Sequence, residues 1–315
     1  MQAGVNGPAR LAAVSVDLDE IPCYAAIHGL PSPPPRAARA IYERALPRLT
    51  RLFDEEEIPA TFFAIGSDLD DPNAARIASL ARSGHEIANH SFGHRYDLTR
   101  LGRAQIRSEI ERGADAIERA CGARPEGFRA PGYTITDPVF DVLEELGVVY
   151  DSSVFPCPAY YAPKAAVIGG MRLVRRKSRS IVDDPRVLTA PADPYRVGRP
   201  YWRRGGGVLE LPIGVTRLAR LPYIGTSVVL AGALGARLLS RAMVGRPLVS
   251  LELHGIDLAD AEADGLGFLA PHQPDLRRPL RAKEAALRAA IATLREAGYR
   301  FVTLREAARA SGGAA

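Results

Sequence analysis

Short apolar runs alternate with helical patterns along the first half of the chain. Residues 11–16, 60–66 and 86–88 have the length and the apolar content of buried strands. Amphipathic helical patterns follow two of them, at 37–56 and 73–83, and the second stops at a glycine. Strands that alternate with helices at this spacing predict βαβ units, and hence an α/β fold with a mostly parallel sheet or barrel.

The same alternation continues to the C-terminus. Further strands are predicted at 127–129, 148–151, 208–213, 248–254 and 300–303, and further helices at 103–121, 137–146, 282–297 and 304–310. We therefore predict a single catalytic domain over 11–310, preceded by a disordered segment at 1–10. The pattern breaks down in a stretch rich in Pro, Tyr and Arg at 155–205, which we interpret as an irregular insertion.

Charge and cysteine content exclude several classes of protein. The net charge is +5, but it comes from arginines spread along the chain without a dense basic block, so no nucleic-acid partner is predicted. Three cysteines without CxxC spacing argue against a disulfide framework or a thiolate zinc site. Residues 1–10 lack the pattern of a secretory signal, so a cytoplasmic location is expected.

Two histidines and two aspartates predict a catalytic metal site. His90 and His94 are four residues apart and would lie on one face of a helical segment, while Asp17 and Asp19 follow the first strand. Two imidazoles and one carboxylate, that of Asp19, can hold one divalent ion and leave positions open for water. Either motif alone is more often an ordinary core or capping feature, so the prediction depends on their combination.

Three further polar residues follow predicted strands. Arg129 could pair with Asp17 and orient it as a general base, and His254 could act as a general acid. Asp151 is a candidate partner that would fix the tautomer of His254. Because active sites of parallel α/β proteins gather at the carboxyl ends of strands, these positions reinforce the metal motif.

In this order, these residues resemble the polysaccharide deacetylase family with its NodB homology domain, carbohydrate esterase family 4. Family-like segments stand at 58–63, 84–94 and 298–304, and the resemblance extends from about 11 to 308. It implies a distorted (β/α)₇ barrel and one divalent metal, zinc first and otherwise cobalt, nickel or manganese. It also implies hydrolytic removal of an acyl group from an amide or an ester. Our first hypothesis is removal of an N-acetyl or N-formyl group from an amino sugar.

The resemblance assigns a role to each motif position. Asp17 corresponds to the base, Arg129 to its partner and His254 to the acid, with the metal on Asp19, His90 and His94. Water activated by the metal would attack the amide carbonyl. The turn at Pro131 and Tyr133 would stabilise the oxyanion through the backbone N–H of Tyr133.

Departures from the family pattern indicate a particular branch and substrate. Asp-x-Asp replaces adjacent aspartates, as in cytosolic members; Gly132 stands between Pro131 and Tyr133; and no Trp follows Asp151. A cytoplasmic protein favours a glycolipid, a lipid-linked sugar or a soluble amino sugar over an extracellular polymer.

The segment 224–244 is apolar but contains Arg237 and Arg241, so a spanning helix is disfavoured. It is interpreted either as an ordinary helix of the barrel or as one that contacts the inner face of a membrane peripherally. The sequence does not decide the oligomeric state.

Two alternative functions stay open. One is a metal-independent amidohydrolase of a small ureido or cyclic amide, as in allantoinase-like members of the family. The other is a binding module that has kept the fold and lost the chemistry. Metal content separates the first alternative from the deacylase, and the presence of every catalytic position argues against the second.

Overall fold

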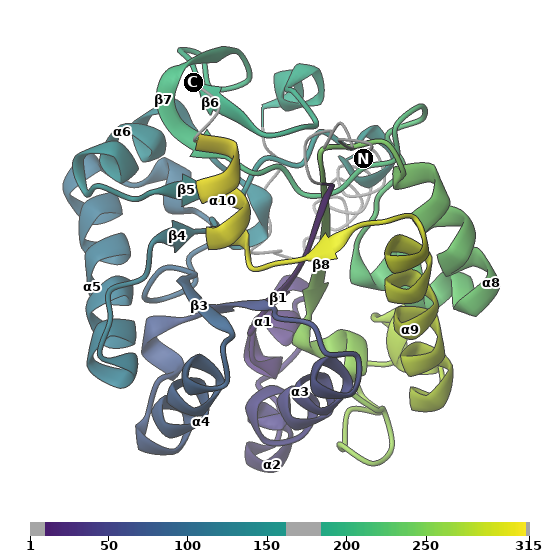
Figure 1. Cartoon of the computed structure of the whole chain (residues 1–315). Coiled ribbons are helices and arrows are strands. Elements are labelled where there is room, and N and C mark those ends of the chain that lie inside the picture. The colour runs from purple at the N-terminus through teal and green to yellow at the C-terminus, as the bar shows by residue number, and fades with distance from the viewer. Residues whose placement is uncertain (1–9, 162–183, 313–315) are drawn as a thin grey trace, which may run out of the picture.

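The computed structural model describes residues 10–161 and 184–312 (Figure 1). Its sheet has the strand order β6-β7-β5-β4-β3-β2-β1-β8, and β9 also pairs with β1. All pairs are parallel except β6 with β7. The strands are β1 Leu11–Asp17, β2 Thr61–Ala64, β3 Glu86–Asn89, β4 Gly127–Phe128, β5 Tyr150–Asp151, β6 Tyr195–Val197, β7 Arg204–Glu210, β8 Leu248–His254 and β9 Arg300–Phe301.

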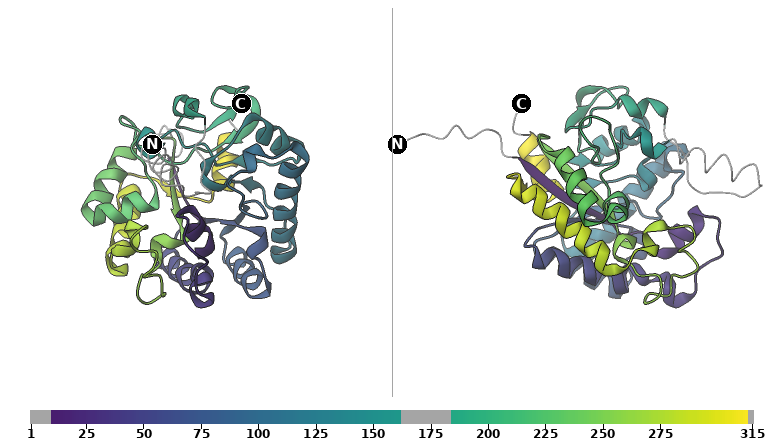
Figure 2. Two further views of the ribbon diagram at one scale, coloured as in Figure 1. Left: turned by 180° about the vertical axis from the view of Figure 1, so that it is seen from behind. Right: turned by 90° about the vertical axis from the view of Figure 1, so that its right-hand side faces the viewer.

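Helices surround the curled sheet, as the views in Figures 1 and 2 show. They are α1 Ile21–Ile27, α2 Pro35–Ala38, α3 Leu46–Glu55, α4 Asp71–Arg82, α5 Arg103–Cys121, α6 Asp137–Glu145, α8 Gly225–Met243, α9 Leu280–Glu296 and α10 Leu304–Gly312. Among the described strands, β6 and β8 end the hydrogen-bonded path without pairing with each other. The predicted α/β fold, a distorted barrel of parallel strands with outer helices, is therefore confirmed.

The central strand β1 sets the position of the site. All of its residues are buried, and it pairs with β2 on one side and β8 on the other. In the register, Asp17 lies opposite both Phe63 and His254. The carboxyl ends of β1, β2 and β8 therefore stand level, and the side chains that follow them meet at one rim.

Two predicted helices are less regular than expected. The helix predicted at 37–56 is divided into α2, a π-helical turn Ile41–Ala45 and α3. Pro47 in the first turn of α3 has no N–H to complete an α-helical hydrogen bond, which favours a wider turn before it. The apolar helix predicted at 224–244 is α8, and it is interrupted at Gly232, which has φ +66° and ψ 179°.

The described residues cover only part of the predicted division of the chain into segments. Most of the segment 1–10 lies outside the described residues, as does the middle of the predicted insertion at 155–205. Of that insertion the structure describes 155–161 and 184–205, which include β6, the beginning of β7 and a short 3-10 helix, Pro185–Thr189.

Candidate active site

The sheet brings the predicted residues to one rim. Asp17 is the last residue of β1, and Asp19 follows two residues later. His90 comes directly after β3, Arg129 directly after β4, and His254 is the last residue of β8. The strands are parallel neighbours, so their carboxyl ends point to the same side of the sheet.

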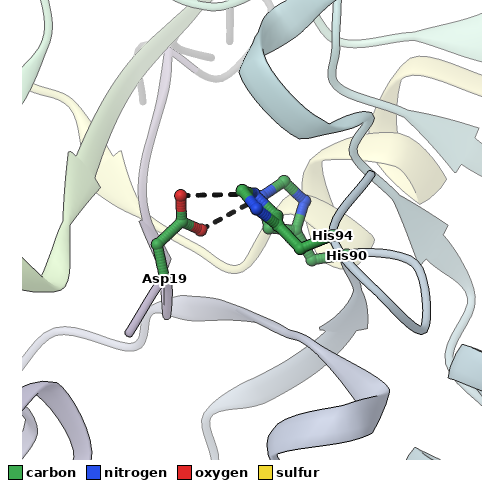
Figure 3. Close-up of side chains that lie close together, drawn as sticks. All are labelled: Asp19, His90 and His94. Atoms are coloured by element: carbon green, nitrogen blue, oxygen red, sulfur yellow. Dashed lines mark ion pairs between the residues drawn. The ribbon is translucent and has the colours of Figure 1, made fainter. Parts of the chain in front are cut away.

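Asp19, His90 and His94 form a compact buried cluster. Asp19 Oδ1 lies 3.4 Å from His90 Nε2, and Asp19 Oδ2 lies 3.2 Å from His94 Nε2. Figure 3 shows the two rings directed at the carboxylate. One ligand atom from each residue falls within 4.8 Å of the others. This is the arrangement expected of groups that share one cation.

A loop, not a helix, brings the two histidines together. Ser91 and His94 have positive φ angles of 64° and 47°, so the segment predicted as helical is a tight turn. The hydroxyl of Ser91 accepts a hydrogen bond from the N–H of His94 at 3.2 Å. Turn geometry, rather than the 3.6-residue period, sets the 4.8 Å separation of the imidazole centroids.

A backbone contact fixes the orientation of the His90 ring. Its Nδ1 lies 2.7 Å from the carbonyl oxygen of Arg129. Since a carbonyl only accepts, Nδ1 donates its proton to it, and Nε2 is the ring nitrogen directed at Asp19. A backbone contact of this kind is the usual way to fix the tautomer of a metal-binding histidine.

The cluster has the unsatisfied atoms that a metal would satisfy. Asp19 Oδ1 and both ring nitrogens of His94 are buried without a hydrogen bond, because the short contacts to Asp19 lack hydrogen-bond geometry. Burial lowers the pKa of His94 to about 4 and keeps the ring neutral. Two imidazoles and a carboxylate are a donor set that zinc and related divalent ions accept. The residues present therefore fit one divalent ion.

Arg129 and Asp17 form a buried ion pair beside this cluster. Arg129 Nη1 donates to Asp17 Oδ1 at 2.6 Å, and the guanidinium also donates to Ser15 and Ser152. The other oxygen of Asp17, Oδ2, lies 3.7 Å from His90 Nε2. One carboxylate oxygen is thus held by arginine while the second faces the metal cluster.

His254 is paired with Glu252, a residue that we did not predict. Glu252 Oε1 lies 2.9 Å from His254 Nδ1, and Tyr133 Oη is 3.5 Å from the same nitrogen. Burial opposes the charged imidazolium, but the carboxylates of Glu252, Asp17 and Asp19 outweigh it and raise the pKa of His254 well above its ordinary value. His254 is therefore held in its protonated form.

The predicted contact between Asp151 and His254 is wrong. Both oxygens of Asp151 accept hydrogen bonds from Ser153, from its N–H at 2.9 Å and its hydroxyl at 2.8 Å. The Ser153 hydroxyl in turn accepts from the N–H of Ala130 at 2.8 Å. Asp151 therefore supports the segment that carries Arg129, because β5 pairs with β4 and is separated from β8 by four strands.

The turn at Pro131 and Tyr133 also differs from the prediction. The N–H of Tyr133, expected to face an oxyanion, donates to the carbonyl of Ala130 at 3.2 Å. Gly132 and Tyr133 have φ angles of 64° and 57°, which turn the Tyr133 side chain toward His254. Pro131 is buried at the start of this turn, and Gly132 rather than Pro131 borders the neighbouring cavity.

A small cavity opens beside the metal cluster and His254. Its volume is about 210 Å³, below the range of about 300–1,000 Å³ that holds a drug-sized ligand, so it can take one part of a larger substrate. Aromatic and aliphatic side chains dominate its wall. The lining residues are Asp19, Tyr24, Ile27, Tyr96, Gly132, Tyr133, Tyr160, Ile224, Thr226, His254, Ile256 and Gln273.

Two of these tyrosines carry hydroxyl groups without partners. Tyr24 Oη and Tyr96 Oη are buried and make no hydrogen bond within the described structure. Burial raises the pKa of both phenols well above the ordinary value, so they remain O–H donors. No sequence motif singles out these two residues. Glu252 could have been found, since it precedes His254 by two on one strand and therefore shares its face.

Comparison with known proteins agrees with this architecture. Residues 39–150 match the model described as polysaccharide deacetylase. A structure from Mycobacterium smegmatis that is assigned to the polysaccharide deacetylases superposes with a TM-score of 0.61 at 20% identity, over 97% of this chain and 91% of that one. The fold and the rim of strand ends define a deacetylase-type α/β barrel. Over residues 39–150 the sequence is similar to the polysaccharide deacetylase family.

Curated relatives share shorter segments. The peptidoglycan deacetylase of Helicobacter pylori is 25% identical over 146 residues, which cover 46% of this chain and 49% of that protein. A chitooligosaccharide deacetylase of Sinorhizobium fredii is 32% identical over 103 residues, 32% of this chain and 47% of that protein. The chain thus spans about half the length of these two relatives.

Proposed function

We propose that this protein is a metal-dependent hydrolase that removes an N-acyl group, acetyl or formyl, from an amino sugar. The observation that carries the proposal is the buried cluster of Asp19, His90 and His94, whose unpartnered atoms converge beside two further acid–base groups. The names of the curated relatives, which act on peptidoglycan and chitooligosaccharides, support an amino-sugar substrate.

Asp19, His90 and His94 would hold the ion, with zinc as the first choice and cobalt, nickel or manganese as alternatives. When bound there, a divalent metal would polarise the substrate carbonyl and lower the pKa of a water molecule. The protein keeps both histidines oriented, through the carbonyl of Arg129 for His90 and the turn at Ser91 for His94.

Asp17 would act as the general base. Arg129 occupies Oδ1 at 2.6 Å, so Oδ2 takes the proton of the attacking water as its oxygen bonds to the acyl carbon. The same arginine is held by Ser15 and Ser152, which limits movement of the carboxylate. Orientation of the base is thereby built into the buried core of the sheet.

His254 would act as the general acid. Its Nδ1 is held by Glu252, and its ring borders the cavity. Nε2 then gives a proton to the amide nitrogen as the carbon–nitrogen bond breaks, which releases a carboxylic acid and the free amine of the sugar. A raised pKa keeps this proton in place at neutral pH.

The hydroxyl groups of Tyr24 and Tyr96 would bind the substrate in the cavity. Both are buried lining residues without a hydrogen bond in the described part of the chain. The Tyr96 ring lies 4.8 Å from the His94 ring, and the Tyr24 ring lies 6.2 Å from the His254 ring, between centroids. Since the N–H of Tyr133 is already used, a phenol hydroxyl is the better donor to an oxygen of the acyl group. Replacing Tyr96 with Phe tests this contact directly.

Among amino sugars we favour one that is carried on a lipid. Ile224 and Thr226, at the beginning of α8, line the cavity, and exposed leucines follow on the same helix. A substrate presented at a membrane would contact both the cavity and the exposed leucines of α8. The cytoplasmic face of the membrane, expected from the sequence, is the proposed location.

The test combines metal analysis with product release. Purified protein is expected to hold about one divalent ion per chain and to release acetate or formate from a panel of N-acyl amino sugars, with loss of both on treatment with a chelator. The Asp17→Asn variant, which keeps all three metal ligands, serves as the control and should retain the ion but lose activity.

Activity that is indifferent to the chelator would replace this proposal with a metal-independent amidohydrolase of a ureido or cyclic amide. A bound ion without any hydrolysis across the panel would indicate a binding protein instead.

A further inference from the structure

We propose that α8 and the loop before it bind the anionic surface of a lipid bilayer. The surface in question, which we call the leucine–arginine face, consists of Leu218, Leu234, Leu238, Arg217, Arg237 and Arg241. The proposal rests on these residues alone and is independent of the reaction proposed above.

Exposed apolar side chains are concentrated on this face. Among the described residues, seven large hydrophobic side chains are exposed, and five of them lie between Leu218 and Leu238. Leu218 is 100% exposed, Leu234 73% and Leu238 58%. Single exposed leucines are common on soluble proteins, but a group of them on one helix and its neighbouring loop marks an interaction surface.

The charge of the same segment has one sign. Residues 211–251 contain five arginines and no aspartate, glutamate or lysine. Arg217, Arg237 and Arg241 are exposed, and no ion pair to any of them occurs within 10–161 and 184–312. Elsewhere on the surface, arginines are commonly paired with carboxylates, as Arg288 is with Glu56 at 2.7 Å. The face therefore repels cations and attracts an anionic surface.

Helix geometry places the two kinds of side chain together. After the interruption at Gly232, Leu234 and Leu238 are four residues apart, as are Arg237 and Arg241, so all four lie on the outer side of α8. The opposite side of the helix, with Val228, Val229 and Ala236, is buried against the body of the protein.

The loop with Leu218 is fixed beside the C-terminal end of α8. The N–H of Arg217 donates to Ala242 O at 3.3 Å, and its Nη1 donates to Val244 O at 3.1 Å. Leu218 is therefore exposed beside the end of α8 that carries Arg241. Figure 1 shows α8 at the periphery of the molecule, on the side opposite α5.

A bilayer surface fits this combination better than insertion across the bilayer. None of the described helices is both long and apolar enough to span a membrane. A helix with leucines and arginines on one face instead lies in the interfacial plane, with the leucines in the acyl boundary and the arginines at anionic headgroups. Docking along α8 would bring the cavity-lining Ile224 and Thr226 close to the lipid surface.

The experiment is cosedimentation of the full chain with vesicles, either of neutral phosphatidylcholine or of the same lipid with 30% phosphatidylglycerol. We expect binding to the anionic vesicles, weakened at high salt. Arg237→Gln and Arg241→Gln should each weaken binding about fivefold, and Leu234→Ser combined with Leu238→Ser should abolish it.

Matched controls lie on the other side of the molecule. Arg119→Gln on α5 and Val149→Ser remove an exposed arginine and an exposed apolar side chain away from this face, and binding should not change. The melting temperature of every variant should equal that of the parent, because all substituted side chains are exposed.

Three outcomes would overturn the proposal. Binding to neither kind of vesicle, or equal binding to both, would exclude an anionic surface. Binding that is lost equally in the control variants would show that the face is not responsible. A dimer in sedimentation velocity that the leucine substitutions dissociate would identify a second copy of the chain as the occupant.

Discussion

Strand β3 has a buried polar residue near each of its ends, and the two residues differ in whether they have partners. At the beginning, Glu86 accepts hydrogen bonds from Tyr150 Oη at 2.9 Å, Thr61 Oγ1 at 2.8 Å and the N–H of Arg305 at 2.8 Å. Just past the other end, the loop after His90 carries His94, whose ring nitrogens have no hydrogen bond.

The difference separates a structural polar group from a functional one. Glu86 and Thr61 together bind the first N–H groups of α10 and so dock the C-terminal helix on the sheet. A buried polar group without a partner costs free energy, so it persists where a ligand supplies the partner. Glu86 therefore stabilises the fold at the beginning of β3, and His94 lies past its other end, where we propose that an ion binds.

The largest effect is expected for Asp17→Asn. Asparagine can still accept the hydrogen bond from Arg129 but cannot take a proton from water. The hydrolysis rate should fall about 10²–10⁴-fold, which is the usual contribution of a positioned general base. Steady-state kinetics, with metal content as the control, measure this. A loss smaller than fivefold would assign the base to another group.

Glu86→Ala should affect stability and not chemistry. It leaves two buried hydroxyl groups and one backbone N–H without an acceptor, so the free energy of unfolding should fall by about 3 kcal/mol. Urea denaturation measures the loss, and the exposed Glu118→Ala is the control. The hydrolysis rate per folded molecule should stay within twofold of the parent. A large loss of that rate would show that Glu86, at the beginning of β3, also contributes to the reaction.

Glu252→Gln should change the pH dependence of hydrolysis. The Glu252 carboxylate raises the pKa of His254, so its removal lowers that pKa and deprotonates the acid at lower pH. The basic limb of the kcat profile should move to lower pH, with a loss of about tenfold at neutral pH and little change in KM. Glu252→Asp keeps a carboxylate near His254, so its basic limb should move less than that of Glu252→Gln. An unmoved basic limb would show that Glu252 has only a structural role.

The smallest effect is expected for His94→Leu in metal-free protein. The His94 ring is buried and has no hydrogen bond, so a leucine of similar size removes none. The free energy of unfolding should therefore change by less than about 1 kcal/mol. Bound metal should be lost. Thermal unfolding in the presence of a chelator measures the first, and metal analysis the second. A loss above about 3 kcal/mol would show that His94 stabilises the fold without an ion.

Much of the site follows from the sequence, since strand ends can be located from local patterns. β8 occupies the predicted range 248–254, and Asp17, His90 and Arg129 all fall at the predicted strand ends. The interval from strand to helix fixes which residues follow a strand, and parallel connections bring those residues to one rim. These two properties are enough to predict that six residues meet at one rim: Asp17, Asp19, His90, His94, Arg129 and His254.

Local sequence patterns do not predict which side chains or backbone groups contact one another across the sheet. The sequence predicts Asp151 as the partner of His254, but four strands separate β5 from β8, and the carboxylate beside His254 is that of Glu252 on the same strand. The N–H of Tyr133 is predicted to stabilise an oxyanion, but in the turn around Gly132 it donates to the carbonyl oxygen of Ala130. Both errors concern contacts that depend on strand order or on positive φ angles, which the residue types alone do not fix.

The sequence by itself determined the alternation of strands and helices, and with it the rim where the reactive residues meet, because hydrophobic periodicity and chain direction are local properties. Only the tertiary structure decided which carboxylate holds His254, that a turn rather than a helix joins His90 to His94, and that the outer side of α8 is left exposed. Those outcomes depend on which elements pack against one another, and packing is set by the whole chain at once.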